Sequence, residues 1–204
     1  MGRHDINLGR AMAAKGLAAG FYAATPVQTA LGWQIVGALA RGDLVLTRDG
    51  GLMPVQSVTR DPRAALWSVR LPARAFANDA TVMLPPGQPV LIETPLALPF
   101  TGEAFALIPA TALEGWRGIA PHVPAETAPI LRLTLTEPAL ISAGPGIWTQ
   151  ADAARRPFDL SQLLDAPQRP VLPLSIARQL VASLIAEEAG SGLSQAAFRP
   201  ENRA

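Results

Sequence analysis

Residues 42 to 58 set the architecture that we expect for the whole chain. They read Gly42-Asp-Leu-Val-Leu-Thr-Arg-Asp-Gly-Gly-Leu-Met-Pro-Val-Gln-Ser-Val58. Two apolar runs flank Arg48-Asp-Gly-Gly51, whose residues tolerate the positive φ of a tight turn, and this pattern predicts a β-hairpin. The stretch contains no nucleophile beside a base. We therefore expect it to be structural, and the function has to be sought around it.

The composition indicates a folded domain and argues against several functions. The chain has 204 residues, of which 49% are hydrophobic, enough to bury a core. Its 17 Lys and Arg against 16 Asp and Glu are scattered, which argues against nucleic acid as a partner. With no Cys and only two His, His4 and His122, the sequence predicts no disulfide, no metal centre and no cofactor.

No stretch is long and apolar enough to predict a membrane span. Residues 11–24 are rich in Ala and Gly, but Lys15 interrupts them. The start, Met1-Gly-Arg-His-Asp5, lacks the apolar run of a secretory signal. We expect a cytoplasmic protein at synthesis, and the sequence leaves later export or incorporation into a particle open.

The 20 Pro and 17 Gly favour many short strands joined by rigid turns. We expect an N-terminal arm at 1–24, a β domain at 25–150, and a linker, helix and polar tail at 151–204. Asp61-Pro62-Arg63 reads as a loop between strands, and Gly144-Pro-Gly146 as the end of the β region. The strands that we expect span 25–29, 32–35, 44–46, 52–58, 66–71, 81–84, 90–93, 104–108, 130–135 and 139–142.

Residues 175–189 predict an amphipathic helix, with Ser175 as its N-cap and Gly190 at its end. Apolar residues repeat at helical spacing along one face, which we expect to dock on the β body or on a neighbouring subunit. The polar face lacks the Lys and Arg that helices lying on membranes carry. The candidate interaction residues are Ile176, Leu180, Val181, Leu184 and Ile185.

Four blocks of sequence follow one another in an order that is typical of one family. They are Thr25-Pro-Val-Gln-Thr-Ala-Leu-Gly-Trp33, Leu39-Ala-Arg-Gly-Asp-Leu-Val-Leu-Thr-Arg-Asp-Gly-Gly-Leu-Met-Pro-Val55, Pro86-Gly-Gln-Pro-Val-Leu-Ile92 and Gly102-Glu-Ala-Phe-Ala-Leu-Ile-Pro-Ala-Thr-Ala-Leu113. Over about residues 21–150 the chain resembles the bacterial Hint (Hedgehog/intein) domains. The resemblance implies an all-β, pseudo-twofold horseshoe of short curled strands. It also implies autoprocessing by an N-to-S or N-to-O acyl shift followed by peptide-bond cleavage.

That chemistry needs residue types that this chain lacks at the matching positions. The family's opening nucleophile falls on or near Gly20, which has no side chain to attack with. The family's Thr/Ser-x-x-His block matches Pro85-Pro-Gly-Gln88, and glutamine cannot cycle a proton near neutral pH. The Asp and His of the late strand block match Thr136 and Pro138. The resemblance therefore implies a catalytically degenerate member with no catalytic residues.

The remaining hydroxyl and imidazole groups near these positions offer weak substitutes. Thr25 is the nearest hydroxyl to the lost nucleophile, but it matches a structural Thr of the first strand. His4 lies in the N-terminal arm, and His122 lies in a proline-flanked loop that we expect at the surface.

The leading hypothesis is a non-catalytic structural or interaction module that docks into a homo-oligomer or a larger assembly. A phage-like particle or a surface appendage would be one setting. The alternative is a protease that still cleaves itself near Gly20 to Thr25. A third hypothesis is a carbohydrate-binding module, in which exposed tryptophans stack on sugars; core packing, with Trp33 on the sheet, is the competing interpretation. The four are Trp33, Trp67, Trp116 and Trp148.

Overall fold

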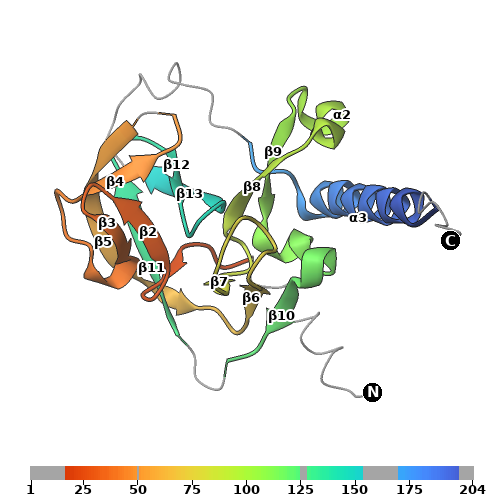
Figure 1. Cartoon of the computed structure of the whole chain (residues 1–204). Helices are drawn as coiled ribbons and strands as arrows, with labels where there is room; N and C mark the ends of the chain where they lie inside the picture. The colour runs from red at the N-terminus through yellow and green to blue at the C-terminus, as the bar shows by residue number, and fades with distance from the viewer. Residues whose placement is uncertain (1–16, 50, 125–127, 154–169, 198–204) are drawn as a thin grey trace, which may run out of the picture.

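Short β-strands form most of the molecule, and one long helix stands at its C-terminal side (Figure 1). The computed structural model describes residues 17–49, 51–124, 128–153 and 170–197. The strands are β1 (Phe21–Tyr22), β2 (Pro26–Thr29), β3 (Gly32–Ile35), β4 (Leu44–Thr47), β5 (Gly51–Ala64), β6 (Ser68–Leu71), β7 (Val82–Leu84), β8 (Pro89–Glu93), β9 (Phe105–Pro109), β10 (Ala120–His122), β11 (Pro129–Leu135), β12 (Ala139–Ser142) and β13 (Trp148–Ala153). The helical elements are the short 3-10 turns η1 (Val36–Ala38), η2 (Pro95–Ala97), η3 (Ala110–Leu113) and η4 (Trp116–Gly118), and the α-helices α2 (Leu98–Thr101) and α3 (Leu174–Ala197).

The β-hairpin expected at residues 42–58 is confirmed. Strands β4 and β5 pair antiparallel from Leu44↔Pro54 to Thr47↔Gly51. Gly51 has φ +71°, a conformation that favours glycine, and its carbonyl accepts a 2.9 Å hydrogen bond from the Thr47 hydroxyl. The pairing on both sides of the turn therefore confirms the hairpin that the sequence predicts, while residue 50 lies outside the described residues.

This hairpin belongs to a ring of strands that closes into a small β-barrel. The pairings run β11–β5, β5–β4, β4–β12, β12–β13 and back from β13 to β11, and the last of these is parallel. Closure leaves the ring without an open edge. Inside and beside it lies a first hydrophobic core that includes Phe21, Val27, Val45, Leu133 and Ile141.

A second core lies under the other half of the molecule. There β8 pairs with β13 and β9 pairs with β8, while β10, β6 and β7 form a separate antiparallel sheet. The buried side chains of this half, among them Trp67, Leu84, Ile108 and Leu113, pack together with the inner face of α3.

The loop expected at Asp61-Pro62-Arg63 is wrong, because these residues continue strand β5. Pairing with β11 extends the strand: Arg60 lies opposite Leu131 and Ala64 lies opposite Pro129. Three residues of β5 thus face one of β11, which is a bulge, and a proline is tolerated in a strand at such a position.

Three further strands were not expected. The proline-flanked segment around His122 is strand β10, whose neighbour is β6. The β region does not end at Gly146, since β13 follows and pairs with β12. Strand β1 places Phe21 in the first core, so the sheet begins four residues before the expected boundary at residue 25.

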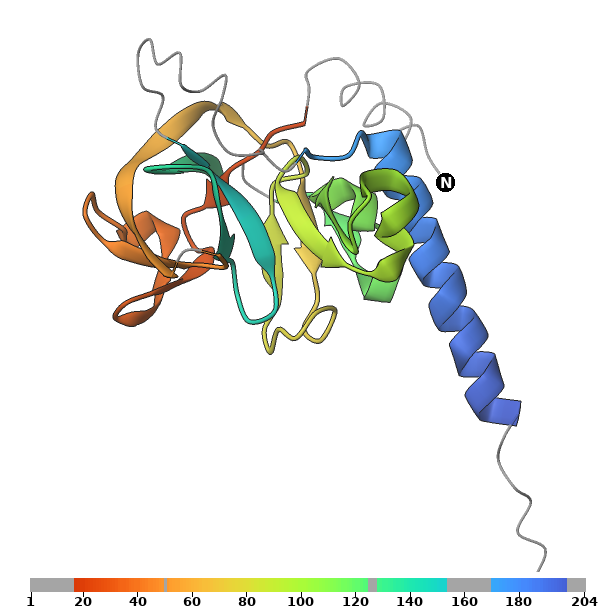
Figure 2. The ribbon, with the colours of Figure 1, turned by 90° about the horizontal axis from the view of Figure 1, so that it is seen from above.

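Helix α3 begins one residue before Ser175 and runs past Gly190. The Ala177 N–H donates to the Pro173 carbonyl at 2.9 Å, so the first helical hydrogen bond starts at Pro173 and Ser175 is not the N-cap. Gly190 is not among the described glycines with positive φ, the conformation that an αL cap needs, and the helix continues to Ala197. Figure 2 shows α3 leaving the body as it runs toward its C-terminal end.

The apolar face of α3 packs on the chain's own β body, one of the two destinations that the sequence left open. Leu180, Val181 and Leu184 are buried in the second core, Ile176 is half-buried against it, and Ile185 is exposed. Most of the five candidate interaction residues are therefore used within the chain. No helix among the described residues has the length and apolarity to cross a membrane.

Candidate functional site

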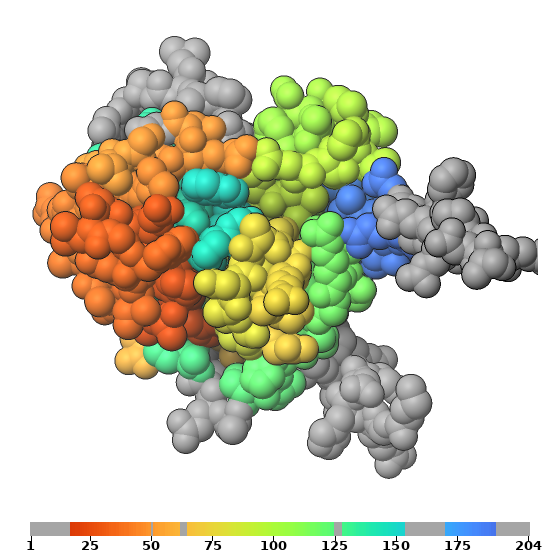
Figure 3. Space-filling model, viewed as in Figure 1, coloured from red at the N-terminus to blue at the C-terminus, as the bar shows by residue number. Residues whose placement is uncertain are grey.

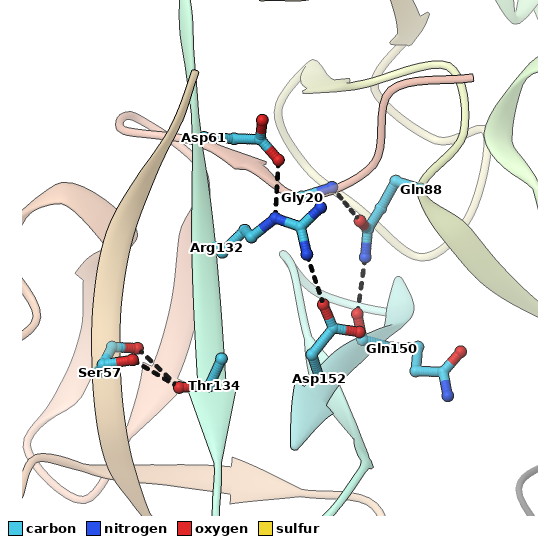
Figure 4. Close-up of polar contacts among 8 residues, drawn as sticks. All are labelled: Gly20, Ser57, Asp61, Gln88, Arg132, Thr134, Gln150 and Asp152. Atoms are coloured by element: carbon cyan, nitrogen blue, oxygen red, sulfur yellow. Dashed lines mark hydrogen bonds and ion pairs between the residues drawn. The ribbon is translucent and has the colours of Figure 1, made fainter. Parts of the chain in front are cut away.

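The fold brings Gly20 and Gln88 together, although 68 residues separate them in the sequence (Figure 4). Strand β1 pairs with β11 through Phe21↔Leu131, so the preceding residue, Gly20, lies beside Arg132. The backbone N–H of Gly20 donates a 2.7 Å hydrogen bond to Gln88 Oε1. Two of the three sequence positions expected to matter for autoprocessing therefore meet at one place.

Hydrogen bonds at both ends of its amide group hold the Gln88 side chain in place. It is 1% exposed, and its Nε2 donates to Thr149 Oγ1 at 2.6 Å and to the Gln150 carbonyl at 2.7 Å. The Gly20 N–H can only donate and the Gln150 carbonyl can only accept, so the orientation of the amide is fixed. The Thr149 hydroxyl donates a hydrogen bond to the Pro89 carbonyl at 2.6 Å.

The backbone at Gly20 leaves no space for a side chain. Its φ is +133°, and a Cβ placed there would lie 2.5 Å from Ile130 Cγ2 and 2.7 Å from the Leu131 carbonyl oxygen. Contacts this short do not occur between real Cβ atoms and their neighbours. In this conformation the position fits glycine, and a serine or cysteine would require β11 to move.

The segment before Gly20 is also held at this place. The Gly87 N–H donates to the Ala18 carbonyl at 2.8 Å, and a Cβ at Gly87 would lie 2.7 Å from both Leu17 Cβ and the Leu17 carbonyl oxygen. Glycine at position 87 thus allows residues 17 and 18 to pass close to the turn before β8.

Charged residues that the sequence analysis did not single out surround the site. Asp61, which is buried in β5, accepts a 2.6 Å hydrogen bond from Arg132 Nε on β11. Arg132 Nη1 also lies 3.9 Å from Asp152 Oδ2 on β13. The arginine on the strand beside Gly20 is therefore placed between two carboxylates, as Figure 4 shows.

The third expected position does not reach this site. Thr136 and Pro138 are exposed between β11 and β12, and no hydrogen bond of the described residues joins them to Gly20 or Gln88. The strand itself does contribute, but through Arg132, which lies earlier in it.

The hydroxyl and imidazole groups near the site have structural surroundings. Thr25 is buried, and its hydroxyl accepts a 3.2 Å hydrogen bond from the Tyr22 N–H, closing a turn after β1. His122 is exposed on β10, and His4 lies outside the described residues. Burial raises the pKa of the Tyr22 phenol, and a hydrogen bond with Ser68 opposes that rise.

The tryptophans do not form a shared surface. Trp67 and Trp116 are buried in the second core, whereas Trp33 on β3 is 47% exposed. Trp148 is half-buried, and the guanidinium of Arg48 lies 5.6 Å from its ring centroid. Beside it is a depression of about 180 Å³, lined by Arg48, Asp49, Leu91, Glu93, Phe105 and Leu140. No group of three or more His, Asp or Glu residues in the described parts of the chain is arranged to hold a metal ion.

The chain is similar to a known protein family and to several solved structures. A family model described as Hint domain matches residues 19–151. Solved structures that are similar include the AceL NrdHF class 3 split intein (TM-score 0.47, 12% identity, covering 68% of this chain and all of the other) and the bacterial intein-like domain from Clostridium thermocellum (0.49, 11%, 66% and 99%). A third is the MchDnaB-1 intein (0.38, 18%, 65% and 100%). No curated protein matches the chain.

Proposed function

The chain belongs to the Hint domain family, and we propose that it is a member that does not cut its own backbone and acts as a structural and interaction module. In this role it would dock into a homo-oligomer or a larger assembly, for which a phage-like particle or a surface appendage is one setting. The observation that carries the proposal is the conformation of Gly20 and the lack of space around it.

Autoprocessing needs a nucleophile at the start of the domain to attack the carbonyl of the preceding residue, Ala19. Gly20 brings no thiol or hydroxyl, and the Cβ contacts with Ile130 and the Leu131 carbonyl leave no space for one. The scissile bond of the family would here join Ala19 to Gly20, so the bond is present without its attacking group.

The second requirement is a proton for the departing amine. Gln88 occupies the place beside the Gly20 amide, but it accepts a hydrogen bond from that N–H. An amide side chain has no proton to give near neutral pH, and Gln88 already donates both of its own hydrogen bonds to Thr149 and Gln150. The arrangement stabilises the intact peptide bond and offers nothing to the leaving group.

The contacts of residues 17–20 support a holding role for the Gly20–Gln88 site. Hydrogen bonds from Gly87 to Ala18 and from Gly20 to Gln88 fix two points of this segment on the turn before β8. A chain cut between Ala19 and Gly20 would give up the contact between Gly87 and Ala18. In the proposed module both contacts instead hold residues 17–20 on the turn before β8.

The horseshoe of two similar curled halves is part of the same proposal. It is supported by the two hydrophobic cores, one beneath β1 to β5 and the other beneath β6 to β9 and α3. No observation favours carbohydrate as the partner, because two of the four tryptophans are buried and the ring of Trp148 is covered by Arg48.

The test is the mass of the purified full chain, followed over days with and without a thiol that would capture an ester or thioester intermediate. We expect one species at 21.4 kDa throughout. A shortened chain would overturn the proposal. The variant Thr25→Val would then distinguish the alternative, since cleavage through Thr25 would stop in this variant and cleavage by any other group would continue.

A further inference from the structure

The edge of the sheet at β3 is open in the part of the chain that the structure describes. Among those residues strand β3 pairs with β2 alone, through Val27↔Gln34 and Gln28↔Trp33. Just beyond it, the Val36 N–H donates to the Thr25 carbonyl at 2.9 Å, and this bond sets the alternation of the ladder. Gln34 therefore points its backbone groups at β2, and Trp33 and Ile35 point theirs at the free edge.

This edge lacks the features that usually prevent pairing with another chain. Strand β3 contains no proline and no charged residue, and no charged residue occurs anywhere from Gly16 to Ala40. Exposed edge strands of monomeric proteins are normally protected by such residues. An uncharged edge can also meet an identical edge without repulsion between like charges.

Apolar side chains surround the open edge. The inward positions of β2 and β4 are Val27, Thr29 and Val45, so the alternating positions on these strands and on their partners face outward. Exposed large apolar residues gather here on three strands and one turn: Leu31, Trp33, Ile35, Leu44 and Leu52. Clusters of this kind, in contrast to scattered exposed residues, mark interaction surfaces.

We infer that the edge of β3 pairs antiparallel with β3 of a second copy of this chain, about a two-fold axis at Gln34. In that register Trp33 of each copy lies opposite Ile35 of the other. Both residues carry free backbone groups, so two hydrogen bonds form at each of the two pairs. An aromatic residue opposite a β-branched one is a favourable cross-strand pair, and the symmetry provides it twice.

The place of β3 in the molecule suits this assembly. In Figure 1 it lies on the side of the body opposite α3, and in Figure 3 the early strands form that flank without the last helix near them. The apolar face of α3 is used internally, so β3 supplies the contact between copies that an assembling module needs. The inference rests on the proposed role as an interaction module and names its surface.

A cysteine at the axis tests the register directly, because the chain has no cysteine of its own. Position 34 would face its own copy across a pair without hydrogen bonds, with Cα atoms about 4.5 Å apart, which a disulfide can span. We expect Gln34→Cys to form a linked dimer on mild oxidation. The control is Leu31→Cys, which is 86% exposed but would lie about 20 Å from its copy in this register. Cross-linking of Gln34→Cys should be about ten-fold faster than that of Leu31→Cys; equal rates would overturn the inference.

Light scattering on the full chain gives the independent readout. The unmodified chain should approach twice its 21.4 kDa as its concentration rises. The variant Trp33→Lys/Ile35→Lys should remain a single chain, and Leu98→Lys should still pair, because Leu98 is equally exposed (50%) but lies on α2. Ile35→Pro removes the edge-facing N–H together with the isoleucine side chain, at a residue whose φ of −88° is near that of proline, and it should also stay single.

A chain that stays single at every concentration, or a double-lysine variant that still pairs, would overturn the inference. The same samples weighed intact report on self-cleavage separately. A full-length chain that stays single would overturn the β3 interface and leave the non-cleaving proposal intact. A shortened chain that still pairs would support the β3 interface and overturn the non-cleaving proposal.

Discussion

The Gly20–Gln88 region and the edge of β3 differ in whether their backbone groups are hydrogen-bonded within the chain. At Gly20 the N–H is bonded to a buried glutamine, and the side chain of that glutamine is bonded to β13. At β3 the backbone groups of Trp33 and Ile35 face outward beside exposed apolar side chains. The first region has its hydrogen bonds within one chain, and in the proposed assembly the second is completed by a second copy. The difference places the proposed function at the edge of the sheet, away from the Gly20–Gln88 site where the family's chemistry would occur.

The largest change in the free energy of unfolding is expected at Gly20, and it tests the contrast between the two regions most strongly. Gly20→Ala should lower the free energy of unfolding by about 2–4 kcal/mol, through backbone strain and the clash with Ile130 and the Leu131 carbonyl. The control Gly42→Ala also has positive φ but meets no atom within 4 Å, so its cost should be about 1 kcal/mol. Urea unfolding of both variants measures the difference. Equal losses in the free energy of unfolding would show that position 20 has space for a side chain.

Removing the Gln88 side chain tests whether its hydrogen bonds stabilise this site. Gln88→Ala removes the bonds that Gln88 makes to the Gly20 N–H and the Gln150 carbonyl, while the Thr149 hydroxyl keeps its bond to the Pro89 carbonyl, and we expect a loss of about 2–3 kcal/mol in urea unfolding. Gln150→Ala is the matched control: it keeps the backbone carbonyl that Gln88 uses, so its cost should be small. A Gln88→Ala variant as stable as the parent would contradict the account of this site.

Tyr22, two residues after Gly20, reports on how closed that region is. It is the single tyrosine of the chain, so the absorbance of tyrosinate at alkaline pH follows this phenol alone. Burial raises its pKa in the folded state, so the folded chain holds the phenol proton more tightly than the unfolded chain. The stability that this provides is complete below about pH 10 and is lost as pH rises through the folded pKa. A titration midpoint at or below pH 10 would mean that the region is open to water.

The smallest effect is expected at the open edge. Trp33→Gln changes a residue that is 47% exposed and belongs to none of the described core clusters, so the free energy of unfolding of a dilute sample should change by about 1 kcal/mol or less. At higher concentrations the same variant should lose the stability that pairing adds to the parent chain. A large cost in dilute solution would assign Trp33 to the core and remove the contrast between the two regions.

Local pattern was enough to predict the elements that local residues determine. The turn at Arg48 to Gly51 and the apolar spacing of Ile176, Leu180 and Leu184 were correctly interpreted, because each is decided within one or two turns of the chain. Where pairing between distant strands determines the structure, the expectations from the sequence were wrong. Pro62 looks like a strand breaker until β11 supplies the bulge that accepts it, and the turn at Gly144 to Gly146 looks final until β13 returns to pair with β12.

The residues of the candidate site likewise fall into those that the sequence identified and those that only the fold brings together. Gly20 and Gln88 were identified through a resemblance, which brings distant positions into relation without a structure, and the fold joins them by a hydrogen bond. Asp61, Arg132 and Thr149 carried no signal of their own, because their roles depend on which strands become neighbours. The alternation of residues 130–135 indicated a strand, but it could not show that Arg132 would lie beside Gly20.

The central claim, that this member of the Hint family keeps its backbone whole, is tested most directly by weighing freshly made full chain after days in neutral buffer. The account predicts a single mass of 21.4 kDa. The appearance of a chain shortened at or near Gly20, together with the released leader, would contradict it.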